Sequence, residues 1–577
     1  MLWYEEYPER LEFELQALKN VGYSFEEDIE KRAAGQLVLY VTYPISGVDH
    51  RLTVVFPPNY PYFAFQVFAS TLQLARHQDP FSKLLCFVAR IDSEWNASQD
   101  SVAKYLLEQL PEVLKANEGK SAVLEARDGA PITGYMEDSF FPGALVVTAE
   151  WNLPLDKVRG KMLIGIEPGS NPNALLRGAI NEVHDLNGNL LGEADAAIKK
   201  RHPSNIKARW VRLSGTPKSN KPLDVLAEAV SVWPQLTQLD FSGGPDIIGV
   251  VFQDEARYKE LHDIWVFIVR FRERSIVPRS KKRLPPGDQY RCYLARSDRG
   301  GQDDIQSRVP RLKALFHKKA AIFGLGALGS TVAWQLARAG VGKLSLTDHD
   351  VVQTGNSPRW MLGASATGIP KAQALSIFIG QNYPFVEATP FGLKVGGTPP
   401  LGDDSQEKWN LQEKLMEQAL NKADLIIDCT VEFTVQHFLS DLAWKLGIPY
   451  IWVSGTPGGW GGIVGRAIRG KTSGCWKCFR YNQYDEVYPS PAFEEGANIH
   501  PVGCFSPTFT GTGFDMDSVA LEAVRLAVST LSLGDENGYP DFDWDVGIVD
   551  LWRDGRPITP HWTTCKLDRN EACDAHE

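Results

Sequence analysis

The sequence has no long apolar run and no excess of positive charge. Its 577 residues contain no apolar stretch near the roughly 20 residues of a membrane-spanning helix. The acidic start, with Glu5 and Glu6, is not followed by the apolar run of a secretion signal. A formal net charge of -11 argues against a general nucleic-acid-binding protein. We therefore expect a cytoplasmic protein that binds neither membrane nor nucleic acid.

Cysteine is scarce, and deciding which role each cysteine has is most of the functional problem. The hydrophobic content of 43% and the charged content of 23% are those of a globular protein, which excludes wholesale disorder. In a reducing compartment each cysteine is a packed core residue, a metal ligand or a nucleophile. The eight cysteines are Cys86, Cys292, Cys429, Cys475, Cys478, Cys504, Cys565 and Cys573.

A nucleotide-binding unit stands at the centre of the second half of the chain. It consists of an apolar strand, the turn GLGALG, a helix and a second apolar strand that ends in two acids. Gly324 and Gly326 let the backbone approach a phosphate, and Gly329 lets the helix pack closely on the strand. Asp348 and Asp350 stand where a carboxylate would meet a ribose hydroxyl. A strand-to-helix turn without a ligand, and an NAD site, remain alternatives at this point.

Further polar residues favour ATP over NAD. Asn356, Arg359 and Lys371 follow the unit, and a third apolar strand ends in Asp428. Cationic side chains offset the charge of a triphosphate, and an aspartate at a strand end can hold Mg²⁺.

This order of motifs resembles the ThiF-type adenylation domain of ubiquitin-activating enzymes and of their bacterial sulfur-carrier relatives. The resemblance implies that Asp350 binds the ribose, that Asp428 holds Mg²⁺, and that Asn356, Arg359 and Lys371 bind the phosphates of ATP. It also implies a homodimer formed through the adenylation domain.

The first part of the chain predicts a small α/β module. We expect helices at 8–20 and 100–114 and strands at 35–44, 50–56 and 65–69. His77, Pro80 and Cys86 lie on the long segment that follows the last strand. By itself Cys86 fits a buried position among apolar neighbours.

The order of these features resembles a ubiquitin-conjugating enzyme of the divergent bacterial branch, which makes Cys86 the acceptor of a thioester. The His-Pro-Asn tripeptide of the eukaryotic enzymes is absent, so the group that would stabilise the oxyanion is not identified.

Two further cysteine motifs lie near the end of the chain. Cys504 stands in GCFSPTFTGTGFD, which is typical of a loop and similar to the thioester-forming segment of bacterial activating enzymes; buried filler is the alternative. Cys475 and Cys478 form a CxxC pair, half of a structural zinc site. The tail has no second CxxC and offers Cys565 and Cys573, so two packed thiols remain the alternative to zinc.

The middle of the chain carries no recognisable chemistry. We expect strands at 143–150, 162–166 and 247–252, a helix at 254–274 and an exposed basic loop at 279–287. A structural or docking domain is the simplest interpretation.

The sequence thus predicts three α/β parts: a ubiquitin-conjugating-like α+β module (1–135), a middle α+β linker or docking domain (136–305) and a Rossmann-like ThiF-type adenylation domain (306–577). Their order resembles the bacterial fusion enzymes of CBASS anti-phage operons. That resemblance implies ATP-dependent activation of the C-terminal carboxylate of a partner, a cGAS-like nucleotidyltransferase or a ubiquitin-like protein, and its ligation to an amine of a target. A sulfur-carrier adenylyltransferase whose first module only binds, and a non-enzymatic sensor of ATP or NAD, are the alternatives.

Overall fold

The computed structural model describes most of the chain, and the chain divides into two compact units, Met1–Gly301 and Gln302–Glu577. Among the described residues, no helix combines the length and the apolar character needed to cross a membrane. Cys504 and the basic loop at 279–287 lie outside the described residues. The described residues are 2–74, 77–87, 95–117, 140–148, 153–241, 244–257, 260–272, 290–397, 405–499 and 508–576.

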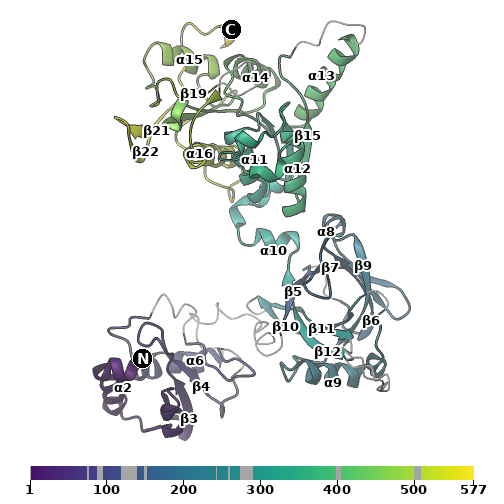
Figure 1. Ribbon diagram of the computed structural model, residues 1–577, viewed down its shortest axis with the longest axis vertical. Helices are drawn as coiled ribbons and strands as arrows, with labels where there is room; N and C mark the ends of the chain where they lie inside the picture. The colour runs from purple at the N-terminus through teal and green to yellow at the C-terminus, as the bar shows by residue number, and fades with distance from the viewer. Residues whose placement is uncertain are drawn as a thin grey trace, which may run out of the picture. The chain divides into compact units, whose positions relative to one another are not determined.

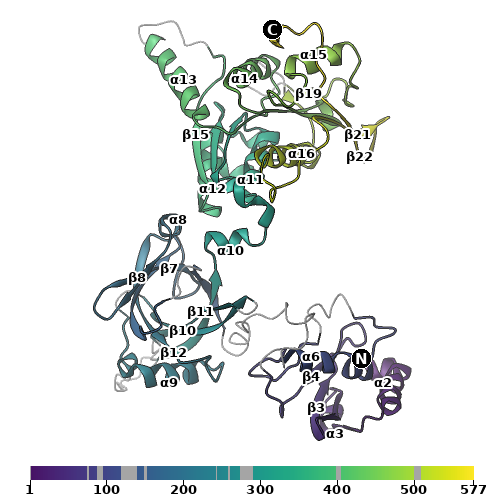
Figure 2. The same cartoon turned by 180° about the vertical axis from the view of Figure 1, so that it is seen from behind.

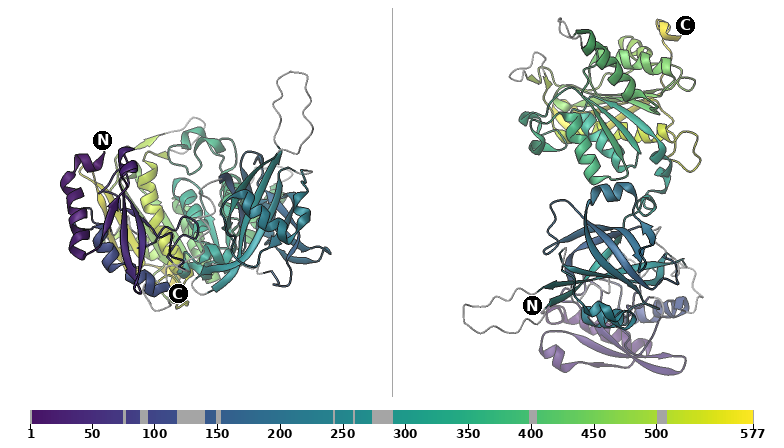
Figure 3. Two further views of the ribbon diagram at one scale, coloured as in Figure 1. Left: turned by 90° about the horizontal axis from the view of Figure 1, so that it is seen from below. Right: turned by 90° about the vertical axis from the view of Figure 1, so that its right-hand side faces the viewer.

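The first unit begins with an antiparallel sheet of order β1-β2-β3-β4, and the predicted strands are confirmed. Its strands are β1 (Phe25–Glu27), β2 (Val38–Ile45), β3 (Val48–Val55) and β4 (Gln66–Phe68). Its helices are α1 (Trp3–Glu6), α2 (Pro8–Val21), α3 (Ile29–Ala33), α5 (Val102–Glu108) and α6 (Leu110–Asn117). Leu11 and Leu18 of α2 share one apolar core with β2, β3 and α5. Figure 3 shows the N-terminal helices and this sheet, in purple, side by side.

Local chemistry explains where these helices begin and end. Pro8 opens α2 at a position where no backbone N–H is needed, and Gly22 ends it in the left-handed region, with a φ of 84°. The helix predicted at 100–114 is instead two helices, α5 and α6. Pro111 is the reason, because proline cannot donate to the preceding turn and is tolerated only in the first turn of a new helix.

The rest of the first unit is a closed sheet of order β5-β12-β11-β10-β9-β6-β7-β8, in which β5 also pairs with β7 (Figures 1 and 2). Helix α9 covers part of it. The elements are β5 (Phe140–Val147), β6 (Arg159–Ile166), β7 (Leu176–Asp185), β8 (Leu190–Glu193), α8 (Ala196–Arg201), β9 (Ser204–Arg212), α9 (Pro222–Val232), β10 (Asp246–Arg257), β11 (Glu260–Arg272) and β12 (Tyr290–Arg299).

The helix predicted at 254–274 is wrong, because this segment forms the end of β10 and all of β11. Every residue from Ile264 to Val269 is buried, with at most 3% of its surface exposed. A strand buried on both faces shows no alternation of apolar and polar residues, so it imitates a buried helix in sequence. The β-branched and aromatic composition of IWVFIV was the signal in favour of a strand.

The second unit is an eight-stranded sheet of order β15-β14-β13-β16-β17-β18-β21-β22. Helices α11, α12 and α16 pack on one face and α13, α14 and α15 on the other (Figure 1). The helices are α10 (Gln302–Gln306), α11 (Ala327–Arg338), α12 (Lys371–Asn382), α13 (Ser405–Leu420), α14 (Phe433–Leu446), α15 (Trp476–Tyr484) and α16 (Gly513–Leu531). The strands of this sheet are β13 (Lys319–Phe323), β14 (Lys343–Thr347), β15 (Glu387–Phe391), β16 (Leu425–Asp428), β17 (Tyr450–Gly455), β18 (Gly461–Ala467), β21 (Val546–Arg553) and β22 (Arg556–Cys565). A separate pair consists of β19 (Asn498–Ile499) and β20 (Thr508–Phe509).

The parallel part of this sheet creates a binding crevice. From β13 the chain continues to β14 and β15 on one side, and it then returns to β16 and β17 on the other. In such sheets ligands bind outside the carboxyl ends of the strands where the order reverses. That point lies between β13 and β16, where Phe323 pairs with Asp428.

Candidate functional site

The glycine turn joins β13 to α11 at this reversal point. Gly324 has a φ of 78°, and a Cβ there would lie 2.7 Å from the backbone of Thr430, so only glycine fits. A Cβ on Gly329 would lie 1.8 Å from the carbonyl oxygen of Gly324, so α11 packs directly on the turn. A Cβ on Gly326 would meet nothing within 4 Å. The amino end of α11, whose N–H groups and dipole attract anions, is therefore open above Gly326.

Asp348 and Trp360 hold the shape of this turn. The buried Asp348 carboxylate accepts hydrogen bonds from the backbone N–H groups of Leu325 and Asp350, each at 2.7 Å. The indole of Trp360 donates to the carbonyl oxygen of Leu325 at 2.8 Å. Both residues act on the backbone of the turn, and this leaves Asp350 as the more accessible of the two predicted ribose ligands.

Asp350 faces Lys371 at the amino end of α12. The Lys371 Nζ lies 2.8 Å from Oδ2 of Asp350, and the Lys371 N–H donates to the Asp350 carbonyl oxygen. Partial burial acts to raise the pKa of Asp350, but the hydrogen bond and charge of Lys371 outweigh it and hold the pKa below its ordinary value. The Asp350 carboxylate is therefore ionised at neutral pH, and the Lys371 side chain lies beside it.

Asn356 and Arg359 lie on the segment after β14. The Asn356 side chain accepts the N–H of Gln353 in a short 3-10 turn, Thr354–Asn356. Arg359 is partly buried, and its guanidinium donates to the carbonyl oxygen of Phe509 and, at 2.9 Å, to the hydroxyl of Thr508. Burial lowers the pKa of Arg359 from its ordinary value.

Asp428 is completely buried at the carboxyl end of β16. One carboxylate oxygen accepts the N–H and the hydroxyl of Thr430 at 2.9 and 2.7 Å, and the other accepts the hydroxyl of Tyr450 at 3.1 Å. Burial raises its pKa to about 6, although these hydrogen bonds act to lower it. Asp428 is thus a carboxylate whose ionised form is costly by itself, and a nearby cation would favour that form.

Cys86 is exposed, between the buried side chains of Leu85 and Phe87. The Cys86 N–H donates to the carbonyl oxygen of His77 at 2.8 Å, and the Leu85 N–H donates to Val67 of β4. Buried neighbours on both sides anchor the segment, so the thiol is presented to solvent from a fixed backbone. This geometry excludes the buried alternative for Cys86.

Three of the four predicted metal ligands come together. The sulfur atoms of Cys475, Cys478 and Cys573 all lie within 4.8 Å of one another, and all three residues are buried. Cys475 caps α15, and its Sγ lies 4.0 Å from that of Cys478 and 3.7 Å from that of Cys573. The hydrogen bond from the Cys475 thiol lowers the pKa of Cys478 to about 4. Cys565 ends β22 outside this group, and its burial raises its pKa to about 11.

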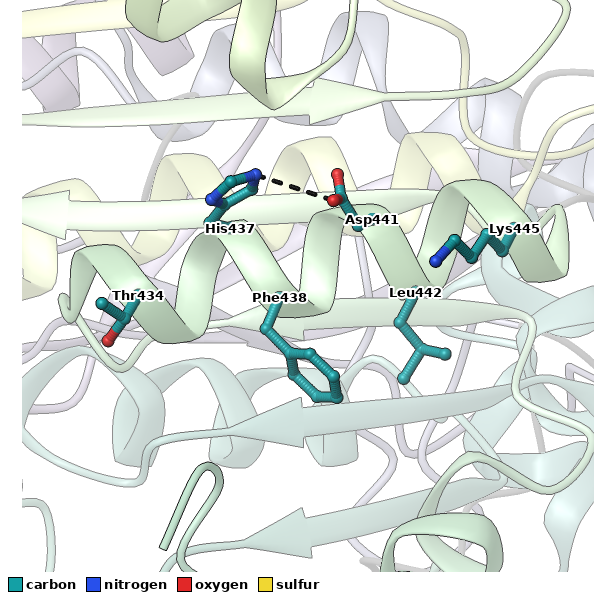
Figure 4. A pocket seen from close by; sticks show the side chains of 6 residues that line it. All are labelled: Thr434, His437, Phe438, Asp441, Leu442 and Lys445. Atoms are coloured by element: carbon teal, nitrogen blue, oxygen red, sulfur yellow. Dashed lines mark ion pairs between the residues drawn. The ribbon is translucent and has the colours of Figure 1, made fainter. Parts of the chain in front are cut away.

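A surface hollow lies near these cysteines but contains none of the predicted residues. Its lining side chains all come from α14, as Figure 4 shows: Thr434, His437, Phe438, Asp441, Leu442 and Lys445. The His437 ring stacks on Trp476 at 5.6 Å, and its Nε2 lies 3.6 Å from a carboxylate oxygen of Asp441. Helix α14 therefore packs on the CxxC segment through His437.

Sequence reasoning missed the residues that hold the site together. Thr430 and Tyr450 bond to Asp428, Trp360 holds the turn, and Thr508 bonds to Arg359. Of these residues only Thr430 could have been found from the sequence, since it follows Asp428 by two residues and a threonine there can donate to the carboxylate. The others come from distant parts of the chain.

Comparison with known proteins agrees with this architecture. The family model described as "Prokaryotic E2 family B" matches residues 18–128, and that of the "ThiF family" matches residues 302–528. The uncharacterized protein y4oA of Sinorhizobium fredii is 31% identical over 599 residues, which cover 99% of this chain and 97% of y4oA. A second protein of that organism, y4qC, is 29% identical over 97% of this chain and 95% of its own.

A more distant relative has a descriptive name. It is the "ATP-dependent ubiquitin transferase-like protein Cap2" of Enterobacter hormaechei, 27% identical over 255 residues, or 44% of this chain and 40% of Cap2. The near-complete match to y4oA and the two family models together define the chain. It belongs to the family of y4oA and is a fusion of a prokaryotic E2 domain with a ThiF adenylation domain, an ATP-dependent enzyme of the E1–E2-like transferase type.

Proposed function

We propose that this enzyme activates the C-terminal carboxylate of a partner protein with ATP and transfers it through Cys504 and then Cys86 to an amine of a target. The observation that supports this most is the exposed Cys86 thiol, fixed between buried neighbours in the E2 domain of a chain that also carries an adenylation domain. An enzyme that only adenylates has no use for a second presented thiol.

The first step is adenylation. An oxygen of the partner's carboxylate attacks the α-phosphorus of ATP, and pyrophosphate leaves with the electron pair of the broken P–O bond. The open amino end of α11 and the side chains of Lys371, Arg359 and Asn356 bind the phosphates, and Asp350 accepts a ribose hydroxyl. The open space above Gly326 fits this role, because a phosphate needs close approach to the backbone there.

The later steps move the acyl group between thiols. The thiolate of Cys504 attacks the acyl carbon and AMP leaves; the thiolate of Cys86 then attacks that thioester and the Cys504 thiolate leaves. An amine of the target, for which lysine is the natural choice, attacks the second thioester and releases Cys86. Each thioester keeps the carboxyl group activated until the amide forms.

Two metal ions fit the residues that are present. Asp428 would hold Mg²⁺, which offsets phosphate charge when it is bound; the cost of ionising this buried carboxyl fits a cation ligand. Cys475, Cys478 and Cys573 would hold a structural Zn²⁺, because three buried sulfur atoms this close together supply most of a tetrahedral thiolate site.

The partner is a protein with an activatable C-terminus. A ubiquitin-like protein is the class that a joined E1-like and E2-like enzyme uses, and a cGAS-like nucleotidyltransferase is the alternative within anti-phage defence. The name of the relative Cap2 supports ubiquitin-like transfer in general. We further propose that the enzyme is a homodimer through its adenylation domain.

Isotope exchange between pyrophosphate and ATP tests the adenylation step. We expect exchange in the presence of a small candidate protein encoded by a neighbouring gene, and none when that protein lacks its last residue. The variant Asp428→Asn should lose exchange while staying folded, since asparagine keeps the shape and the hydrogen-bonding capacity of the buried side chain. Full exchange in this variant would remove Asp428 from the mechanism.

A further inference from the structure

The guanidinium of Arg359 is held by two neutral acceptors. It donates to the hydroxyl of Thr508 at 2.9 Å and to the carbonyl oxygen of Phe509, and its charge lies 5.5 Å from the centre of the Phe509 ring. These two bonds use one N–H on each terminal nitrogen. A guanidinium has further N–H groups in the same plane, so its orientation is fixed while donors remain for another ligand.

The charge of Arg359 is not neutralised by the part of the chain that the structure describes. Among those residues Arg359 has no ion pair with a carboxylate, although it is partly buried. A partly buried cation with only neutral acceptors is an electrostatic cost that a bound anion would relieve. Hydroxyl and carbonyl acceptors suit such a site, because they orient the guanidinium without cancelling its charge.

The acceptors belong to a hairpin formed by β19 and β20, which contacts the guanidinium of Arg359. Strands β19 and β20 pair with Asn498 opposite Phe509, and the Thr510 N–H donates to the carbonyl oxygen of Ala497. A Cβ on Gly513, where α16 begins, would lie 2.9 Å from the carbonyl oxygen of Pro358. The hairpin therefore holds the guanidinium of Arg359, and the start of α16 packs closely on the backbone next to it.

We infer that Thr508 and the main-chain carbonyl of Phe509 are positioning groups, which orient the guanidinium of Arg359 toward the phosphates of ATP. This inference rests on the proposed function of Arg359. Its consequence is that ATP affinity depends on a hairpin whose hydroxyl group lies four residues after Cys504 in the sequence.

The test is the affinity for ATP, measured by calorimetry on the full-length chain. Thr508→Val removes the hydroxyl and keeps the shape, and it should weaken binding about five- to ten-fold, because a guanidinium that has lost one of its two orienting bonds must be ordered further at the moment of binding. Thr508→Ser keeps a hydroxyl and should bind as the unaltered protein does. Thr510→Val is the matched control, since its hydroxyl faces Ala497 and not Arg359, and it should change the affinity less than two-fold.

A double-mutant cycle separates positioning from general damage to the hairpin. In an Arg359→Met background, Thr508→Val should have no further effect on ATP affinity. Unchanged or tighter binding in Thr508→Val alone, or the same loss in both backgrounds, would overturn the inference. Absence of ATP binding in the unaltered protein would instead overturn the proposed function, and this inference with it.

Discussion

The E2 domain and the adenylation unit present their reactive side chains in opposite settings. Cys86 is exposed to solvent, and only its neighbours Leu85 and Phe87 are buried. In the adenylation unit, Asp428 and the cysteine group of Cys475, Cys478 and Cys573 are themselves buried. Replacement of an exposed side chain that lies between buried neighbours should change the chemistry and leave the stability of the fold unaltered. A buried group contributes to stability as well, so its replacement should change both.

The largest effect on stability should come from the cysteine group. Cys573→Ser should reduce bound zinc from about one per chain to well below that and lower the free energy of unfolding by roughly 3–5 kcal/mol, because loss of a structural metal is a loss of folding energy. Elemental analysis and chemical denaturation measure the two quantities.

The control for this prediction is Cys565→Ser. Cys565 is half-buried and lies outside the group, so its replacement should leave the zinc content unchanged and cost less than about 1 kcal/mol. If Cys565→Ser loses as much metal as Cys573→Ser, Cys565 is a ligand after all and the group is rearranged when metal binds.

Replacement of Asp428 should have a smaller effect on the free energy of unfolding, and it should raise this free energy at neutral pH instead of lowering it. Its pKa is about 6 in the folded protein and 3.8 without the protein environment, so the folded state binds more protons between these values. The contribution of Asp428 to the free energy of unfolding should therefore be complete below about pH 4 and decrease by up to roughly 3 kcal/mol as the pH rises through 6. Asp428→Asn should remove this pH-dependent contribution. Its free energy of unfolding at pH 8 should be about 1–3 kcal/mol higher than that of the unaltered protein.

Urea denaturation of both proteins at pH 5 and pH 8 measures this difference. Glu536→Gln, at an exposed position after α16, is the matched control and should leave the pH dependence unchanged. A variant Asp428→Asn that is less stable than the unaltered protein at pH 8 would mean that the buried carboxylate is stabilised by its surroundings.

The smallest effect on stability is expected at Cys86. Cys86→Ala should change the free energy of unfolding by less than about 0.5 kcal/mol, as is usual for exposed positions. The same variant should lose the most rapidly alkylated thiol among the cysteines that the structure describes, since the buried thiols are inert. Mass spectrometry after brief treatment with iodoacetamide measures this. Cys292→Ala, at a half-buried thiol whose pKa burial raises to about 11, should not alter the alkylation pattern.

The position of the candidate adenylation site in the fold was predictable because its sequence signals are local. The glycine turn, the acids after β14 and the aspartate after β16 all lie at carboxyl ends of parallel strands, and that topology brings them together. The sequence could not predict that the Asp348 side chain points toward the glycine turn. Its hydrogen bond with the Leu325 N–H depends on the backbone conformation of that turn.

The rest of the molecule was less predictable for physical reasons. In the closed sheet of the first unit, β11 is buried on both faces from Ile264 to Val269, so its sequence resembles that of a buried helix. The partner of the CxxC pair is Cys573, which follows Cys475 by 98 residues. Spacing alone could not choose between Cys573 and Cys565, because tertiary packing brings one of them close and leaves the other on β22.

The most direct test of the two-thiol mechanism is to locate the acyl group in cysteine variants. The enzyme is incubated with ATP and an activatable partner, and adducts are resolved on gels with and without a thiol reductant. We expect Cys504→Ala to form the adenylate but no thioester, and Cys86→Ala to stop with a reducible adduct on Cys504 and no amide product. Undiminished conjugation in Cys86→Ala would contradict the account and leave the E2 domain as a binding module.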